Sequence, residues 1–272
     1  MDIENHAQNK ITLPGMRGLL YLACLLTFIA GIQLFVLTEQ TDRYFAWTIA
    51  VPLTAAFLGA NYLASALLTF LSARKQNWVQ ARATLPSVLV FTTLLLVATL
   101  LHYDKFHWNS VFGWAWLLVY VAVPPLLLYL LIRQWRSPGE VGPRLRPMPF
   151  WLRGVLFLEG LYLVGLGAWM FWEPAQAAPY WPWKLTPLTA RAVASWLCGI
   201  GISALQIPLE NDFDRIGPPL LTFTAIGALQ VVALIRFPGD FIWSSLSGVY
   251  YLLFLANILF LGFYSLRLSR RA

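Results

Sequence analysis

Charged residues are scarce in this 272-residue chain, since only 11% of it is Asp, Glu, Lys or Arg. A soluble domain carries about 25% charged residues, whereas 59% of this chain is hydrophobic. A soluble protein of that composition would lack a polar surface, so lipid is the expected solvent. The net charge of +7 comes without a basic run interleaved with aromatics, and nucleic acid is therefore not expected as a partner.

Cysteine and histidine are also rare, with two and three residues. Cys24 and Cys198 lie in apolar stretches and no CxxC occurs, which argues against a disulfide framework and a zinc site. No phosphate loop, HExxH or GxSxG motif is present. The sequence therefore predicts no catalytic residue, no metal and no cofactor, and enzyme activity is not expected.

Long apolar runs are what the chain has instead. Each run is close to the ~20 residues that a helix needs to cross a bilayer. Continuous apolarity over such lengths excludes barrel strands, which alternate and span about 10 residues. The predicted fold class is all-α, a polytopic membrane protein with eight transmembrane helices. They are expected at 18–37, 47–71, 85–101, 111–132, 151–172, 187–207, 219–235 and 241–266.

Positive charges separate the two sides of the predicted membrane. Of the 19 Lys and Arg residues, 14 fall in the tails and alternate connections on one side. The other side holds only Arg43, Lys105, Lys184 and Arg236. Because positively charged loops stay in the cytoplasm, we expect a multi-pass protein of the cell (plasma) membrane, an inner membrane, with both termini cytoplasmic.

One helical unit is predicted to occur twice. Residues 17–47 align with 153–183 without a gap, at a constant separation of 136, and Trp47 meets Trp183. Further on, PLTA at 52–55 matches the same letters at 187–190. An even number of spans in each unit places both copies the same way up, a parallel repeat. The predicted domains are a cytoplasmic tail (1–16), a first four-helix repeat (17–132), a cytoplasmic linker (133–150), a second four-helix repeat (151–267) and a tail (268–272).

Residues 100–108, LLHYDKFHW, gather His102, Asp104 and His107 at the predicted outer face. The corresponding stretch of the second half keeps the Phe and Trp but neither histidine, so the shared fold does not require a metal there. On a helix, residues five apart point about 140° away from each other. Three alternatives stay open: a polar turn facing water, a contact for a partner or substrate, and a metal or haem site in the first copy.

Glu159 and Arg191 form the candidate intramembrane polar site. Glu159 is the one acid inside a predicted span, and a carboxylate there costs several kcal/mol and indicates function by default. It is expected either to couple protons or bind a cation, or to pair structurally with an Arg or Tyr. Arg191 lies about one turn into its helix, where it either reaches the interface or contacts an anion from inside the bundle. The two are expected on opposite faces, without a direct pair. The acidic run at 210–214 is expected to be a solvated loop.

These patterns favour a transporter or small-solute binding protein with a pathway between the two repeats. The duplication and the asymmetric placement of Glu159 and Arg191 support it. A structural or accessory subunit of a larger membrane complex is the alternative, since helix faces with few charges can pack on partners. A membrane enzyme acting on lipid is less favoured. The expected partners are the lipid bilayer, a small solute or ion, and membrane subunits.

Overall fold

A computed structural model describes residues 9–271, without the side chains at 266 and 269–271. This part is all-helical, at 77% helix and with no strands among its residues. Eight of its helices are long and apolar enough to cross a membrane. The all-α class and the number of spans are therefore confirmed. The predicted tail residues 1–8 and 272 lie outside the described residues.

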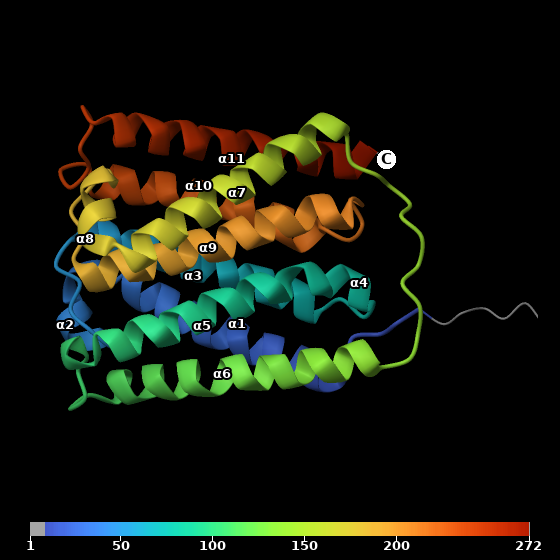
Figure 1. Ribbon diagram of the computed structural model, residues 1–272, viewed down its shortest axis with the longest axis horizontal. Helices are drawn as coiled ribbons and strands as arrows, with labels where there is room; N and C mark the ends of the chain where they lie inside the picture. The colour runs from blue at the N-terminus through green and yellow to red at the C-terminus, as the bar shows by residue number, and fades with distance from the viewer. Residues whose placement is uncertain (1–8, 272) are drawn as a thin grey trace, which may run out of the picture.

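The eight long helices lie side by side, with their axes roughly along one direction (Figure 1). They are α1 (Pro14–Phe35), α3 (Pro52–Ala73), α5 (Leu85–Leu101), α6 (Val111–Arg136), α7 (Phe150–Trp172), α9 (Pro187–Glu210), α10 (Gly217–Arg236) and α11 (Leu246–Arg271). Short helices α2 (Thr41–Tyr44) and α8 (Pro174–Ala177) lie at one end of the bundle, and α4 (Trp78–Ala81) lies at the other (Figure 1).

Two spans begin five residues later than the apolar runs predict, at Pro52 and at Leu246. Proline is favoured in the first turn of a helix, where its missing N–H costs nothing, and it sets the start of α3. The residues before both helices are apolar because they pack into the end of the bundle, where Trp47 and Phe241 are buried. Apolarity thus extends beyond the helix at both places.

The helices form an inner pair and an outer group. Helix α1 packs on α3, and α7 packs on α9; α3 also packs on α10, and α5 on α9. In α3 and α9, 78% and 72% of the apolar window is buried, against 22% to 33% in α1, α6, α7 and α11. The outer helices therefore present long apolar faces to the expected lipid.

Small residues allow the closest helix contacts. A Cβ at Gly59 would meet the backbone of Leu34 and Phe35 on α1, and one at Gly167 would lie 2.9 Å from the Ala194 carbonyl oxygen on α9. Glycine at such positions lets two backbones approach, as is common between membrane helices. The two contacts fix α1 against α3 and α7 against α9.

We call the end that carries residues 137–149 the linker side and the opposite end the far side. On the linker side, the acidic run expected to be solvated is buried, with Glu210, Asp212 and Arg215 at most 5% exposed. Arg82 Nε donates to Glu210 Oε1 at 2.6 Å, and the linker covers these residues because Leu145 N donates to Asp212 Oδ2 at 2.8 Å. The solvated-loop prediction was wrong because linker amides and arginines take the place of water around the carboxylates.

Candidate functional site

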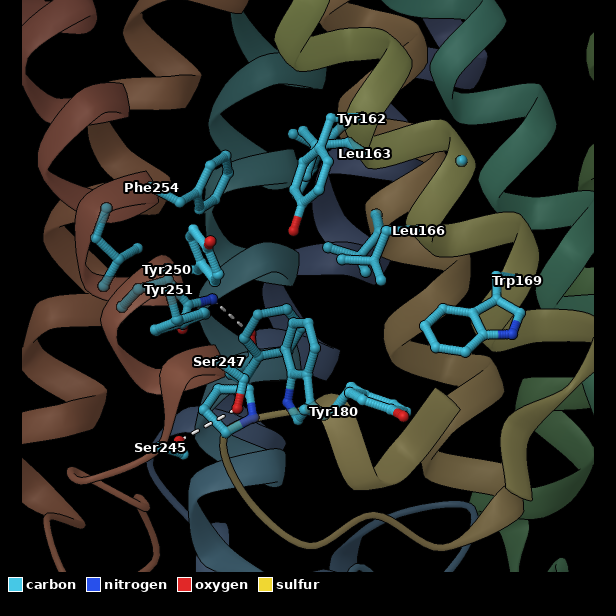
Figure 2. A pocket seen from close by; sticks show the side chains of 18 of the residues that line it. Tyr162, Leu163, Leu166, Trp169, Tyr180, Ser245, Ser247, Tyr250, Tyr251 and Phe254 are labelled. Atoms are coloured by element: carbon cyan, nitrogen blue, oxygen red, sulfur yellow. Dashed lines mark hydrogen bonds between the residues drawn. The ribbon is translucent and has the colours of Figure 1, made fainter. Parts of the chain in front are cut away.

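A cavity of about 690 Å³ lies between α7 and α11. Its volume is within the 300–1,000 Å³ that is typical of ligand sites. Helices α9, α10 and α3 form its inner wall, and Figure 2 shows side chains of α7 and α11 on its two sides. It is lined by Phe57, Asn61, Tyr162, Leu163, Gly165, Leu166, Trp169, Pro179, Tyr180, Trp181, Pro182, Leu197, Ile200, Ile226, Gln230, Ser245, Leu246, Ser247, Tyr250, Tyr251, Phe254 and Leu255.

The opening exists because α7 and α11 meet only towards the linker side. There the rings of Trp151 and Tyr264 are 5.2 Å apart, and Asn257 Nδ2 donates to Glu159 Oε1 at 2.7 Å. Towards the far side, α7 crosses the bundle obliquely and separates from α11 (Figure 1). The cavity fills the space between them from Tyr162 onwards.

Amide and phenol groups from three helices form the polar part of the inner wall. The Phe57 carbonyl oxygen accepts from Asn61 Nδ2 at 2.9 Å and from Gln230 Nε2 at 3.1 Å. Tyr251 OH donates to Gln230 Oε1 at 3.1 Å. The side chains of Gln230 and Tyr251 therefore have hydrogen-bond partners, whereas only the amide nitrogen of Asn61 has one.

That atom is Asn61 Oδ1, which is buried and has no hydrogen-bond partner among the described residues. Trp181 Nε1, from the segment between α8 and α9, is also buried without a partner. Both residues line the cavity. One unpartnered acceptor and one unpartnered donor therefore belong to residues of the same cavity wall. Each costs about 1–3 kcal/mol while it is buried without a hydrogen-bond partner.

Glu159 lies just beneath this cavity, towards the linker side, and Asn257 is its partner. The space beside its side chain is about 10 Å³, close to the minimum for one water molecule. Leu163, Ile200 and Phe254 line both that space and the large cavity, so they separate Glu159 from it. This geometry supports a structural pair at Glu159 more than a solute or proton path.

Arg191 lies far from this pair and contacts one of the histidines. Its Nε donates to the Phe171 carbonyl oxygen at 3.0 Å, where α7 ends. Its Nη1 lies 2.7 Å from His102 Nε2. Because arginine can only donate, His102 accepts with Nε2 and is neutral. Burial, and next the Arg191 charge, lower the pKa of His102 below its usual value.

Asp104 and His107 have other partners. Asp104 pairs with Lys105 at 2.8 Å in the exposed turn, and this hydrogen bond lowers the pKa of Asp104. His107 Nε2 lies 3.1 Å from Thr48 Oγ1, and its Nδ1 lies 3.3 Å from the Phe45 carbonyl oxygen. The structure thus joins His102 to Arg191 and gives His107 separate partners. Over the described residues, no group of three or more His, Cys, Asp or Glu could hold a metal ion.

Sequence reasoning did not single out most of the cavity residues. An amide inside a span, such as Asn61, indicates an interhelical hydrogen bond, and no motif marks Trp181, Gln230 or Tyr251. One signal was present: six of the lining residues are Tyr or Trp on α7, α11 or the segment before α9. Such amphipathic rings often line ligand sites, but membrane-interface belts have the same composition.

A smaller cavity of about 310 Å³ lies in the first half, between α1 and α6. Its lining residues have counterparts in the large cavity at separations of 136 or 135, as Phe45 has Trp181 and Trp116 has Tyr251. Here the polar groups are partnered. Tyr62 and Tyr120 hydroxyls are 2.6 Å apart, and Trp116 Nε1 donates to Thr99 Oγ1 at 3.0 Å.

Comparison with known proteins identifies no relative: no protein-family model, no curated protein and no solved structure matches the chain. A function for the chain therefore rests on its fold and its cavities.

Proposed function

We propose that this chain is a membrane transporter or small-solute binding protein whose ligand occupies the cavity between α7 and α11. One observation carries the proposal: a cavity of about 690 Å³ with an unpartnered acceptor and an unpartnered donor at its wall. Sequence reasoning placed a pathway between the repeats. The proposed site instead lies within the second half, with only Phe57 and Asn61 contributed by the first.

The protein is proposed to be two copies of one four-helix unit, related by an axis along the bilayer normal. Matching contacts support this. The His107 amide donates to the Ala46 carbonyl oxygen, and the Ile242 amide donates to that of Pro182. The pairs of helices that pack together also correspond, since α1 with α3 matches α7 with α9. In this scheme the units are 17–132 and 151–267, joined by 133–150.

The linker side is proposed to be cytoplasmic. Arginines form its contacts around the end of α9: Arg82 and Arg144 donate to Glu210, Arg146 donates to Asp214, and Arg215 donates to the Pro143 carbonyl oxygen of the linker. Such arginines are expected on the positively charged side of a plasma-membrane protein. A reporter fused after Ala272 is expected to be cytoplasmic.

The residues of the candidate intramembrane polar site have structural roles in this proposal. Glu159 and Asn257 hold α7 against α11 at the closed end of the opening. Arg191 and His102 hold the far-side end of α7 through the Phe171 carbonyl. Neither pair contacts the solute. The outer-face group of His102, Asp104 and His107 is likewise assigned to the far-side turn.

Two substitutions on α7 test the cavity. Gly165 lines it, and a Cβ there would meet nothing within 4 Å, so Gly165→Phe fills the cavity without a backbone clash. Gly154 has equally open surroundings on the same helix but does not line the cavity, which makes Gly154→Phe the matched control.

The readout is native mass spectrometry of protein purified from its own membranes in mild detergent. We expect a small molecule bound to the wild type and to Gly154→Phe, but not to Gly165→Phe. A wild type that carries no bound molecule, and takes none up from a total extract of those membranes, contradicts the proposal.

An accessory subunit is the second candidate, and one groove favours it. A space of about 400 Å³ between α10 and α11 is lined only by apolar residues: Val231, Leu234, Ile235, Pro238, Trp243, Leu252, Leu255, Ala256 and Leu259. Such a face can accept a helix of another membrane subunit. Stoichiometric copurification of a partner, lost when Ala256 is replaced by Trp, would support this function.

A further inference from the structure

We infer that the cavity between α7 and α11 takes an uncharged, lipid-soluble amphiphile that enters sideways from the bilayer and presents a hydrogen-bond donor beside an acceptor. A diacylglycerol-like lipid alcohol has this chemistry. The inference rests on the proposed function and names the class of its ligand.

The position of the opening argues for access from lipid. Tyr162 lies ten residues before the end of α7 at Trp172, about 15 Å along the axis, which is about half of the hydrocarbon thickness. Tyr162 and Tyr250, on opposite sides of the opening, are 58% and 57% exposed on helices whose outer faces contact lipid. The cavity therefore extends from the far-side interface to about the middle of the membrane.

The lining argues against a charged ligand. None of the 22 lining residues is Asp, Glu, Lys, Arg or His. A charge moved into surroundings of low dielectric needs an opposite charge or several hydrogen bonds, and Glu159 is separated from the cavity by a layer of apolar side chains. A phosphate or ammonium group inside would have no counterion, whereas an alcohol or ester would need none.

The unpartnered atoms define the polar end. Asn61 Oδ1 accepts a hydrogen bond and Trp181 Nε1 donates one, and both are buried without a protein partner. Both atoms are closed off from the open space of the cavity in this structure, so small side-chain rotations must expose them. A ligand hydroxyl can then donate to the first, and a neighbouring carbonyl or ether oxygen can accept from the second. Figure 2 shows the rings of Tyr162, Tyr250 and Phe254 grouped around the same cavity, where they offer apolar surface to the rest of the molecule.

The test uses the full-length protein in phosphatidylcholine vesicles with one of two photoreactive probes. The first is a diazirine-bearing diacylglycerol, and the second is phosphatidic acid with the same chains, in which a charged phosphate ester replaces the free hydroxyl. After irradiation, labelled peptides of α7 and α11 are counted by mass spectrometry. We expect the diacylglycerol probe to label them about tenfold more than the phosphatidic acid probe, because the phosphate would be buried without a counterion.

Two tryptophan variants report on the polar end. Trp181→Phe removes the unpartnered donor and no protein hydrogen bond, so the fold is retained while diacylglycerol labelling falls about fivefold. Trp196→Phe is the matched control, since Trp196 Nε1 is also buried without a partner but lies outside this cavity. It is expected to label like the wild type.

The outcomes separate the two claims. Equal or stronger labelling by phosphatidic acid, or a charged molecule bound to the purified wild type, overturns the inference and leaves the proposed function standing. Labelling that Gly165→Phe does not reduce, together with a wild type that binds no small molecule, overturns both. Unchanged labelling in Trp181→Phe overturns the assignment of the polar end.

Discussion

The two cavities are lined by residues that lie 135 or 136 positions apart in the chain, yet one is about 690 Å³ and the other about 310 Å³. The inner wall makes the difference. Asn61 of α3 lines the larger cavity, and the residue 135 positions later is Trp196 of α9, whose ring lies 3.9 Å from that of Phe91 and 5.0 Å from that of Tyr62. The first half thus has the short amide of Asn61 at this position, and the second half has the indole of Trp196, which packs among aromatic rings.

The two cavities also differ in whether their polar groups have hydrogen-bond partners. In the first half the hydroxyls of Tyr62 and Tyr120 partner each other. In the second half the corresponding positions are Leu197 and Leu255, and Asn61 Oδ1 and Trp181 Nε1 lack partners. If the halves arose from one unit, the first has its polar groups satisfied internally and the second keeps room and unpartnered atoms for a ligand. The difference between the two cavities thus lies in a few side chains, Tyr62 and Tyr120 in one and Asn61 and Trp181 in the other.

The largest expected effect comes from removing the Trp196 ring of α9, which packs against Tyr62 and Phe91 of the first half. Trp196→Ala should destabilise the protein by about 3–5 kcal/mol, because a buried indole is lost and a cavity remains. Thermal unfolding in detergent measures it, and Trp135→Ala, at a residue that is 67% exposed, is the control with little effect. A cost below about 1 kcal/mol would mean that the contacts of Trp196 with Tyr62 and Phe91 contribute little to stability.

A smaller effect tests how closely the halves match in backbone packing. Gly59 contacts the α1 backbone, whereas the residue 135 positions later is the buried Ala194. Gly59→Ala should cost about 1–3 kcal/mol through overpacking. Gly18→Ala on α1, where a Cβ meets nothing within 4 Å, should be neutral or slightly stabilising. If Gly59→Ala is equally neutral, α1 can move away from α3 far enough to accept an alanine, as α7 accepts Ala194 on α9.

The Tyr62–Tyr120 pair gives a third test through a double-mutant cycle. Tyr62→Phe alone leaves the Tyr120 hydroxyl buried without its partner and should cost about 1–2 kcal/mol. Tyr62→Phe with Tyr120→Phe should be nearly neutral, because no polar group is then left unpartnered. Chemical unfolding of both variants measures the coupling. Additive losses would show that the hydroxyls do not act as a pair.

The helices could be predicted from the sequence, but the site could not. Uninterrupted apolar runs and prolines determine spans such as 85–101, which the structure reproduces as α5, because lipid requires every peptide group to be bonded within a helix. The cavity depends on the angle between α7 and α11, which side-chain packing sets and no periodicity encodes. The burial of Asp212 was missed for the same reason, since it depends on amides 67 residues earlier in the chain.

The smallest effect concerns the far-side ends of α1 and α7. Arg236 donates to the Phe35 carbonyl oxygen at the end of α1, and Arg191 donates to that of Phe171 at the end of α7. Only the second contact includes a titrating partner, His102, at 2.7 Å from Arg191. Burial and Arg191 lower the pKa of His102, with Lys105 acting in the same direction and Asp104 opposing them.

Because the folded protein favours neutral His102, it binds fewer protons there than the unfolded chain does. The stability from this contact is therefore complete above the unfolded pKa of about 6.5 and is lost as pH falls through that value towards the lower folded pKa. The melting temperature of the wild type should fall modestly between pH 7.5 and pH 5 by this contribution, and His102→Gln should remove it. An identical pH dependence of the melting temperature in His102→Gln would contradict this prediction. It would show that protonation of His102 does not weaken the contact at the far-side end of α7.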